Sequence, residues 1–136
     1  MSEPSAFDAD WASRYRDVVN ADATLGVIGR HCAVTFLLEM GESAYIVEMR
    51  SGRIEAMTPI AQAFDLNWEF AIRAPAESWA KFIREVPPPM YTDVIFMSFN
   101  GLAELEGNLL RFWQNIRALL HMLDLMRVVE AEAVPA

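Results

Sequence analysis

The spacing of apolar residues changes along this chain from a helical period to a strand period and back again. Residues 6–20 carry large apolar side chains every three or four positions, beginning with Phe7 and Trp11, which predicts an amphipathic helix. A second, shorter helix is predicted over residues 22–29, with Asp22 as its N-cap.

The next part of the chain alternates with a period of two. Three segments rich in β-branched and aromatic residues, at 31–40, 43–50 and 53–57, predict strands. The two-residue connections at 41–42 and 51–52 are short enough for hairpins, so these segments predict an antiparallel meander.

Two further strands are predicted, at 67–74 and at 101–106. Because side chains alternate across a strand, the first of these should carry its apolar and charged residues on opposite faces. The expected apolar face holds Trp68, Phe70 and Ile72, and the expected polar face holds Glu69 and Arg73.

A helix is predicted between these two strands. Pro75 suits the first position of a helix, and apolar residues continue the pattern to Val86, where the proline run 87–89 ends it. The prolines predict a stiff corner that lays residues 90–100, a short helix or irregular segment, across the core and over the open end of the sheet.

The most regular apolar pattern belongs to a single long helix predicted to open at Asn108. We expect the preceding Gly107 to adopt a backbone conformation that a Cβ atom disfavours. At 100° per residue the apolar stripe of this helix lies within about 140° of arc. It comprises Leu109, Phe112, Trp113, Ile116, Leu119, Leu120, Leu123 and Met126.

Together these elements predict an α+β fold in which a five-stranded, mostly antiparallel sheet is covered on one face by helices. The 136 residues are expected to form a single domain, with residues 1–5 and 130–136 as flexible tails.

The composition is unusually apolar for so short a chain, with 54% hydrophobic residues and a mean hydropathy of +0.16. The apolar runs are far shorter than the roughly 20 residues of a membrane span. Eight Met, eight Phe and four Trp suggest an apolar surface that can adapt to a guest, although the same residues also fill ordinary cores.

The net charge and the cysteine content limit which classes of partner and which cellular compartment are expected. The net charge of −8 argues against nucleic acid and anionic membrane, both of which require a basic surface. The single cysteine, Cys32, and the acidic, polar N-terminus predict a cytoplasmic protein without a secretory signal.

Residues with catalytic or metal-binding chemistry are scattered. His31 and His121 are far apart and have no Cys or carboxylate at ligand spacing, so we predict no metal site. Cys32 is expected to be a buried, inert thiol. We identify no catalytic residue and no cofactor motif, and we therefore do not expect an enzyme.

Acidic residues in the strands allow more than one interpretation. Glu104 and Glu106 lie two apart and hence on one face of a strand, which suits paired carboxylates for acid–base catalysis but equally a solvated face. Glu39 and Glu48, in the first two strands, could form ion pairs with Arg50 or Arg30 or could line a polar mouth, and we favour the ion pairs.

Four segments of the chain occur in a recognisable order: WASRYRDVVNADATLGVIGRHCAVTFLLEMGESAYIVEMRSGRI, WEFAIRAPAESWAKFI, PPPMYTD and GLAELEGNLL. Together they span roughly residues 11–126, and in this order they resemble the sterol carrier protein type 2 domain family in its bacterial stand-alone form.

The resemblance implies that the sheet and helices enclose an elongated apolar tunnel for fatty acyl chains, acyl-CoA esters or sterols, and it implies no catalytic residue. The expected partner is an apolar small molecule or lipid, without stable membrane insertion. Residues expected to line the tunnel face the helix-covered side of the sheet: Phe36, Leu38, Trp68, Phe70, Phe82, Phe96, Phe99, Trp113, Ile116 and Leu120.

A second hypothesis assigns the protein an accessory or interaction role. In this hypothesis bulky side chains such as Phe112 and Trp113 fill the pocket, and an outer apolar strip made of Leu110, Met122 and Leu125 docks to an enzyme or forms a homodimer. A third, enzymatic interpretation stays open only because an α+β cavity can host acid–base chemistry.

Overall fold

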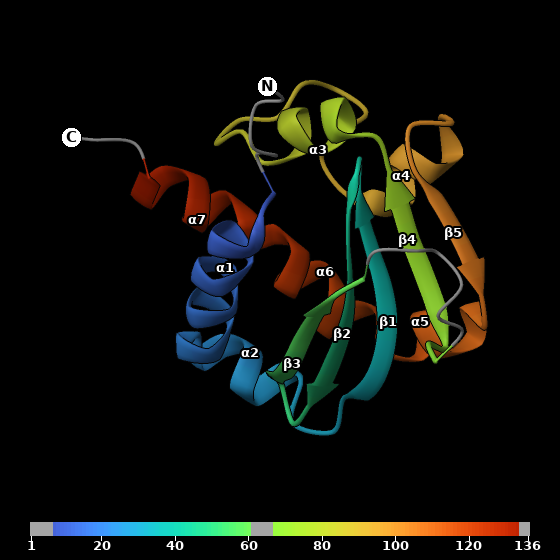
Figure 1. The fold of residues 1–136 in the computed structure, drawn as a ribbon. Coiled ribbons are helices and arrows are strands. Elements are labelled where there is room, and N and C mark those ends of the chain that lie inside the picture. The colour runs from blue at the N-terminus through green and yellow to red at the C-terminus, as the bar shows by residue number, and fades with distance from the viewer. Residues whose placement is uncertain (1–6, 61–66, 134–136) are drawn as a thin grey trace.

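The computed structural model describes residues 7–60 and 67–133, so the predicted tail at 1–5 lies outside the described residues. Five strands form one sheet in the order β3-β2-β1-β4-β5 (Figure 1). The strands are β1 (Ala33–Met40), β2 (Ser43–Arg50), β3 (Arg53–Pro59), β4 (Phe70–Ala74) and β5 (Glu104–Gly107).

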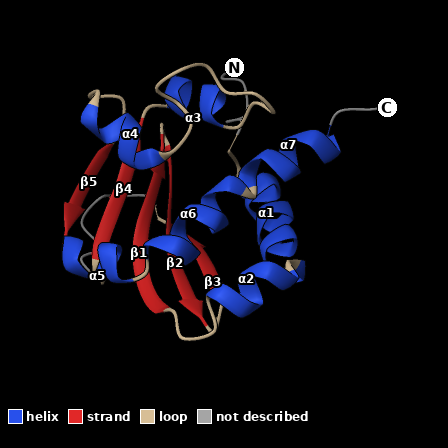
Figure 2. Cartoon of the chain, turned by 180° about the vertical axis from the view of Figure 1, so that it is seen from behind, coloured by secondary structure: helices blue, strands red, loops and turns tan. Residues whose placement is uncertain are grey.

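Seven helices accompany the sheet in this part of the chain: α1 (Ala9–Ala21), α2 (Ala23–Ile28), α3 (Ala76–Phe82), α4 (Val94–Phe99), α5 (Leu109–Gln114), α6 (Ile116–Asp124) and α7 (Met126–Ala133). Figure 2 shows α4, α5 and α6 in front of the strands, on one face of the sheet. None of the helices described is long and apolar enough to cross a membrane.

The sheet is mixed. Strand β1 pairs antiparallel with β2 and parallel with β4, and the outer pairs β2–β3 and β4–β5 are antiparallel. The prediction of an α+β fold with a mostly antiparallel, five-stranded sheet is therefore confirmed. The two predicted hairpins are also present, because β1–β2 and β2–β3 are joined by two-residue connections.

Helix α1 covers the β3 edge of the sheet. The amide side chain of Asn20 donates to the Ile54 carbonyl oxygen over 3.0 Å and accepts from the Ile54 N–H over 2.7 Å. Arg16 donates to the carbonyl oxygen of Glu55 over 2.6 Å. Side chains of α1 thus occupy backbone positions that a further strand would otherwise use.

The single long helix predicted after Asn108 is wrong, because the chain turns at Asn115 and Leu125 to give α5, α6 and α7. At Asn115 φ and ψ are −117° and 21°, and its side-chain amide donates to the Arg111 carbonyl oxygen. The break changes which residues are buried, since a stripe calculated for one straight axis no longer applies. Helix α7 continues to Ala133, within the segment predicted as a flexible tail.

The helix predicted over 75–86 is shorter than expected. Pro75 is its N-cap, and the helix ends at Phe82, so Val86 is 84% exposed. The proline run does lead into a short helix, α4, with Asp93 as N-cap accepting from the Phe96 N–H over 2.8 Å.

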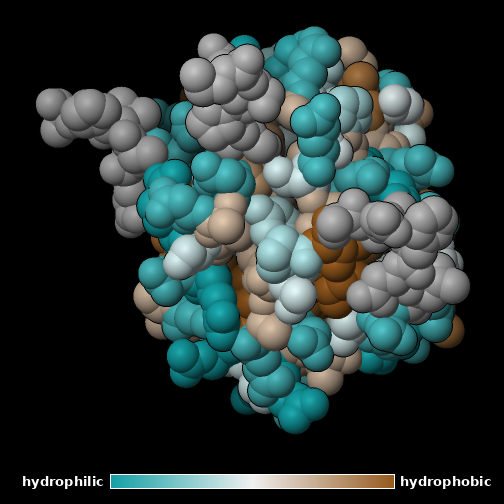
Figure 3. Space-filling view, in the orientation of Figure 1, coloured by the Kyte–Doolittle hydropathy of each residue, from teal (hydrophilic) through white to brown (hydrophobic). Residues whose placement is uncertain are grey.

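The face predicted for Trp68 is also wrong. Phe70 and Ile72 belong to the main core under the helices, whereas Trp68 packs on the opposite face of the sheet with Leu37 and Ala71. Regular strand geometry begins only at Phe70, so alternation cannot be extended back to position 68. Figure 3 shows this outer side of the molecule, where a hydrophobic patch is visible near the middle of a face that is otherwise largely hydrophilic or of intermediate hydropathy.

Candidate functional site

The helix-covered face of the sheet is lined with stacked aromatic rings. The Phe36 and Phe70 rings are parallel with centroids 5.2 Å apart, and Phe112 of α5 meets Phe70 edge-on at 5.6 Å. All three side chains are 0% exposed. Phe112 therefore fills part of the space above β1 and β4, as the accessory hypothesis expected of it.

Around this buried floor lies a set of apolar residues that are only half-buried. They come from the segment before α4, from α4 and the turn after it, and from β5 and α6, and all of them pack against the main core. We call this set the apolar margin: Tyr91, Ile95, Leu102, Leu105, Ile116 and Leu120.

Four large apolar side chains on α4 and α5 are exposed outright. Phe96 and Phe99 of α4 are 44% and 76% exposed, and Leu110 and Trp113 of α5 are 65% and 47% exposed. The sequence placed Trp113 on the buried stripe, but α5 is only six residues long and turns Phe112 inward instead.

The ten residues predicted to line a tunnel therefore separate into four groups. Six lie on the helix-covered side: Phe36, Leu38, Phe70 and Phe82 in the core, and Ile116 and Leu120 in the apolar margin. Phe96, Phe99 and Trp113 are exposed, and Trp68 lies on the outer face.

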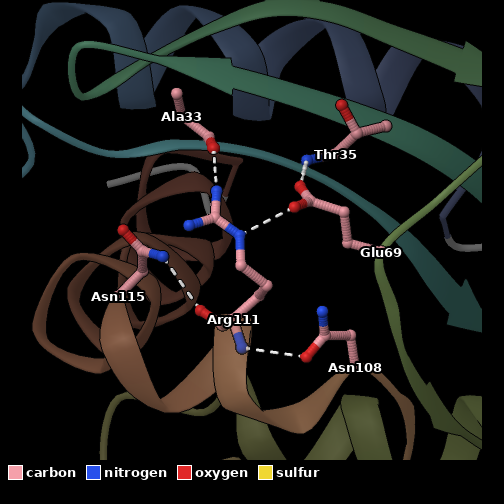
Figure 4. Close-up of polar contacts among 6 residues, drawn as sticks. All are labelled: Ala33, Thr35, Glu69, Asn108, Arg111 and Asn115. Atoms are coloured by element: carbon pink, nitrogen blue, oxygen red, sulfur yellow. Dashed lines mark hydrogen bonds and ion pairs between the residues drawn. The ribbon is translucent and has the colours of Figure 1, made fainter.

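A polar cluster fixes α5 against the ends of β1 and β4 (Figure 4). The Arg111 guanidinium donates to Glu69 over 2.8 Å and to the Ala33 carbonyl oxygen over 2.6 Å. The second carboxylate oxygen of Glu69 accepts from the Thr35 N–H over 2.8 Å. Sequence reasoning missed this cluster. The signals available were Arg111, outside the apolar stripe of the predicted helix, and Glu69, on the predicted polar face of its strand.

The same cluster lies beside the only cysteine. Burial raises the pKa of the Cys32 thiol, the Arg111 charge opposes that rise, and Glu69 adds to it. The thiol is thus held in its protonated, poorly nucleophilic form, as predicted.

Glutamates on the outer face of the sheet surround Arg73. Arg73 lies 3.5 Å from Glu39 and 2.9 Å from Glu106, and its guanidinium stacks 5.8 Å from the Trp68 ring. The predicted pairing of Glu39 with Arg50 or Arg30 is wrong, because the parallel β1–β4 pairing sets Arg73 directly beside Glu39. Arg50 instead lies 3.8 Å from Glu55.

His121 has a structural contact. Its Nε2 lies 2.8 Å from the Asp22 carboxylate, which also caps α2 by accepting from the Leu25 N–H over 2.8 Å. Among the described residues there is no group of three or more His, Cys, Asp or Glu that could hold a metal ion.

Two open clefts of similar size mark the described surface. One, of about 360 Å³, lies at the end of β1 and β4 and includes Glu39, Arg73, Leu102 and Glu104. The other, of about 350 Å³, lies beside Cys32 and the α5–α6 junction. Of the ten predicted lining residues, only Ile116 contributes to these two clefts.

Solved structures identify the fold. The chain superposes on a crystal structure of sterol carrier protein 2 with a TM-score of 0.71 at 15% identity, covering 90% of this chain and 97% of that one. A solution structure of a conserved hypothetical protein from Thermus thermophilus, possibly sterol carrier protein, gives a TM-score of 0.71 at 16% identity, covering 95% and 92%.

A third similar structure is the ubiquinone synthesis protein UbiJ-SCP2, with a TM-score of 0.57 at 14% identity, covering 100% and 99%. The chain therefore has a sterol carrier protein 2-like fold. No family model and no curated protein matches the sequence.

Proposed function

We propose that this protein is a cytoplasmic, non-enzymatic carrier of an apolar or acyl-type ligand, such as a fatty acid, an acyl-CoA ester or a sterol-like molecule. The ligand would lie on the helix-covered face of the sheet and be held by the removal of its apolar surface from water. The fold supports this class of function, and the position of the apolar residues supports a ligand site on the helix-covered face of the sheet.

The observation that carries the proposal is the apolar margin. Its residues touch the core yet remain half-exposed, so an acyl chain lying against Leu105, Ile116 and Leu120 would remove further apolar surface from water. Each Å² removed contributes about 25 cal/mol.

We propose that α4 is the element that moves when a ligand enters. Arg127 of α7 donates to the Thr92 carbonyl oxygen over 3.0 Å and to the Phe82 carbonyl oxygen over 2.8 Å, which anchors the corner before α4. Helix α4 has only six residues beyond this anchor, so a small rotation there would uncover the margin.

The experiment is a titration with a fluorescent fatty acid, read through tryptophan emission. Trp113, on α5, should transfer energy to the bound probe, whereas Trp68 lies on the outer face of the sheet. Trp113→Phe should therefore reduce the signal more than Trp68→Phe does. A probe that binds without this difference would lie elsewhere, and absence of binding to any apolar probe would remove the carrier hypothesis.

A second candidate function is that of an accessory protein whose pocket is filled by its own side chains and which acts through a partner or a homodimer. The Phe36–Phe70–Phe112 ring contacts favour it, because they occupy the floor of the site. Native mass spectrometry separates the two functions, because it reports co-purified lipid and oligomeric state in one measurement.

A further inference from the structure

We propose that the β5 edge of the sheet binds an extended segment of another protein as an added antiparallel or parallel strand, and that this segment carries basic residues on the side facing the outer face of the sheet. This inference rests on the backbone of β5, the charges beside it and the apolar residues at its ends. It does not depend on the carrier function.

The first argument is the direction of the backbone groups of β5. The Asn108 N–H donates to the Glu69 carbonyl oxygen over 2.7 Å, and Phe70 lies opposite Gly107 in the register. In an antiparallel ladder alternate residues point toward the partner strand and away from it. Leu105 and Gly107 therefore turn their N–H and C=O groups away from β4.

The second argument is that, among the described residues, the outward backbone groups have hydrogen-bond partners at one edge of the sheet and not at the other. At β3, Asn20 and Arg16 satisfy outward backbone groups of the strand. At β5, no hydrogen bond from the described part of the chain reaches the outward groups of Leu105 or Gly107. Figures 1 and 2 both show β5 as the last strand at this edge of the sheet, with no helix or strand of the described residues beyond it.

The third argument is charge. Glu104 and Glu106 are exposed on the outer face of β5, and the guanidinium of Arg73 is shared between Glu39 and Glu106. Within the described residues Glu104 has no ion-pair partner. An added strand with Lys or Arg opposite Glu104 would supply the missing cation.

The same charges disfavour a second copy of this chain as the occupant. Pairing β5 with itself through Leu105 sets Glu104 opposite Glu106 of the other copy. Moving the two-fold axis by one residue sets Glu106 opposite its own equivalent. Like charges directly opposite each other destabilise a strand pair, so the edge selects a basic partner over itself.

The fourth argument is apolar surface at both ends of the strand. Helix α4 precedes β5 and exposes Phe99, and α5 follows β5 and exposes Leu110. Charged residues and short length often serve only to protect an edge from aggregation. The exposed Phe99 and Leu110 next to that edge instead favour association with another chain. They would contact an added strand whose apolar side chains lie beside Leu105.

The test uses a short fluorescent peptide in which lysine and valine alternate, with three variants of the full-length protein. Glu104→Lys should weaken binding about fivefold or more and reverse the preference toward a glutamate–valine peptide. Glu48→Lys makes the same change on the outer face of the interior strand β2, where Glu48 is exposed, and should leave binding nearly unchanged. Leu105→Pro removes an outward N–H without removing a bond to β4, and it should abolish binding.

Amide exchange locates the peptide. Binding should slow exchange at Leu105 and Gly107 and leave the β3 edge unchanged. Four results would each overturn the proposal: no binding of the lysine–valine peptide, equal binding by wild type and Glu104→Lys, protection at β3 instead of β5, or a homodimer that protects the β5 edge. If Leu105→Pro fails to fold, Glu104→Lys and the exchange pattern still decide the question.

Discussion

Gly107 is the last residue of β5, directly before the N-cap of α5, and it has a φ of +93°. A Cβ atom there would lie 2.8 Å from the Glu69 carbonyl oxygen and 3.0 Å from the Trp68 ring. The expectation that this glycine needs a conformation that other residues avoid is confirmed. Both a strained backbone and a steric clash therefore oppose any substitution.

We predict that Gly107→Val lowers the free energy of unfolding by about 1–3 kcal/mol, measured by urea denaturation. Gly101 is a matched control, because its φ of +71° is also positive but a Cβ there meets nothing within 4 Å. Gly101→Val should thus show the backbone cost alone. Equal losses for the two variants would mean that the contact with the Glu69 carbonyl contributes nothing.

Asp22 gives a prediction about pH. Burial alone would raise the pKa of this carboxyl group, but the Leu25 N–H and His121 outweigh burial and hold the pKa below its ordinary 3.8. A carboxyl group with a depressed folded-state pKa stabilises the fold above its unfolded pKa. That stability is lost as the pH falls through the folded-state pKa.

Asp22→Asn should therefore reduce the fall in stability as the pH drops below about 4. Asparagine caps a helix as well as aspartate does, so the start of α2 should survive the change. Chemical denaturation across this pH range is the measurement, with Asp17→Asn on the exposed side of α1 as control. If the unfolding free energy of Asp22→Asn depends on pH as steeply as that of the wild type, the contacts of the Asp22 carboxylate do not contribute to the pH dependence of stability.

At the scale of elements, local signals predicted the structure where a short stretch of chain decides its own conformation. The two hairpins and the Asp22 cap belong to this class, since turn residues and capping side chains act within a few positions. The helix breaks at Asn115 and Leu125 are different, because packing against distant parts of the chain determines them. Leu125 and Met122 are buried because α6 and α7 change direction to pack against the rest of the fold.

This change of direction also removes the apolar strip that the accessory hypothesis required. Of its three members only Leu110 is exposed, and Met122 and Leu125 are 0% and 7% exposed. Leu125→Glu would therefore destabilise the fold instead of testing a dimer interface.

The pairing of α1 with β3 gives a prediction at this scale. Asn20→Ala leaves both the N–H and the C=O of Ile54 without their partner, so unfolding free energy should fall by about 1–3 kcal/mol. Asn20→Asp keeps the acceptor but not the donor and should lose less. Amide exchange at Ile54 should quicken in Asn20→Ala and change less in Asn20→Asp, which keeps the acceptor for the Ile54 N–H. Unchanged exchange in Asn20→Ala would show that water replaces the amide without loss.

Helix α4 gives a second prediction. If α4 opens to admit ligand, amide exchange across 90–99 should slow when a saturating fatty acid is added. Exchange in the β1–β2 hairpin should change little, because that hairpin is paired on both strands within the sheet. Equal protection at 90–99 with and without fatty acid would identify the segment as a fixed wall.

At the scale of the molecule, the sequence predicted the fold class but only part of the site. Apolar patterning placed Phe36 and Phe70 on the helix-covered side, because side chains alternate regularly along β1 and β4. Alternation could not place Trp68, which precedes the regular strand, and a straight helix could not place Trp113. Neither could it find the Arg111–Glu69 pair, whose members come together because β5 pairs with β4 and sets Asn108 beside Glu69.

Ligand binding also has a consequence for the stability of the whole molecule. A ligand that binds only the folded state raises the free energy of unfolding by about 2.7 kcal/mol at a hundred times its dissociation constant. A fatty acid should therefore raise the melting temperature, and Leu120→Gln in the apolar margin should reduce that rise. Val27→Gln is the control, since Val27 is 66% exposed on α2 and is not one of the residues of the apolar margin. A rise that survives Leu120→Gln and Ile116→Gln unchanged would place the ligand elsewhere on the fold. If no acyl chain raises the melting temperature and no lipid co-purifies, we would conclude that the Phe36, Phe70 and Phe112 rings fill the space where a carrier binds its ligand.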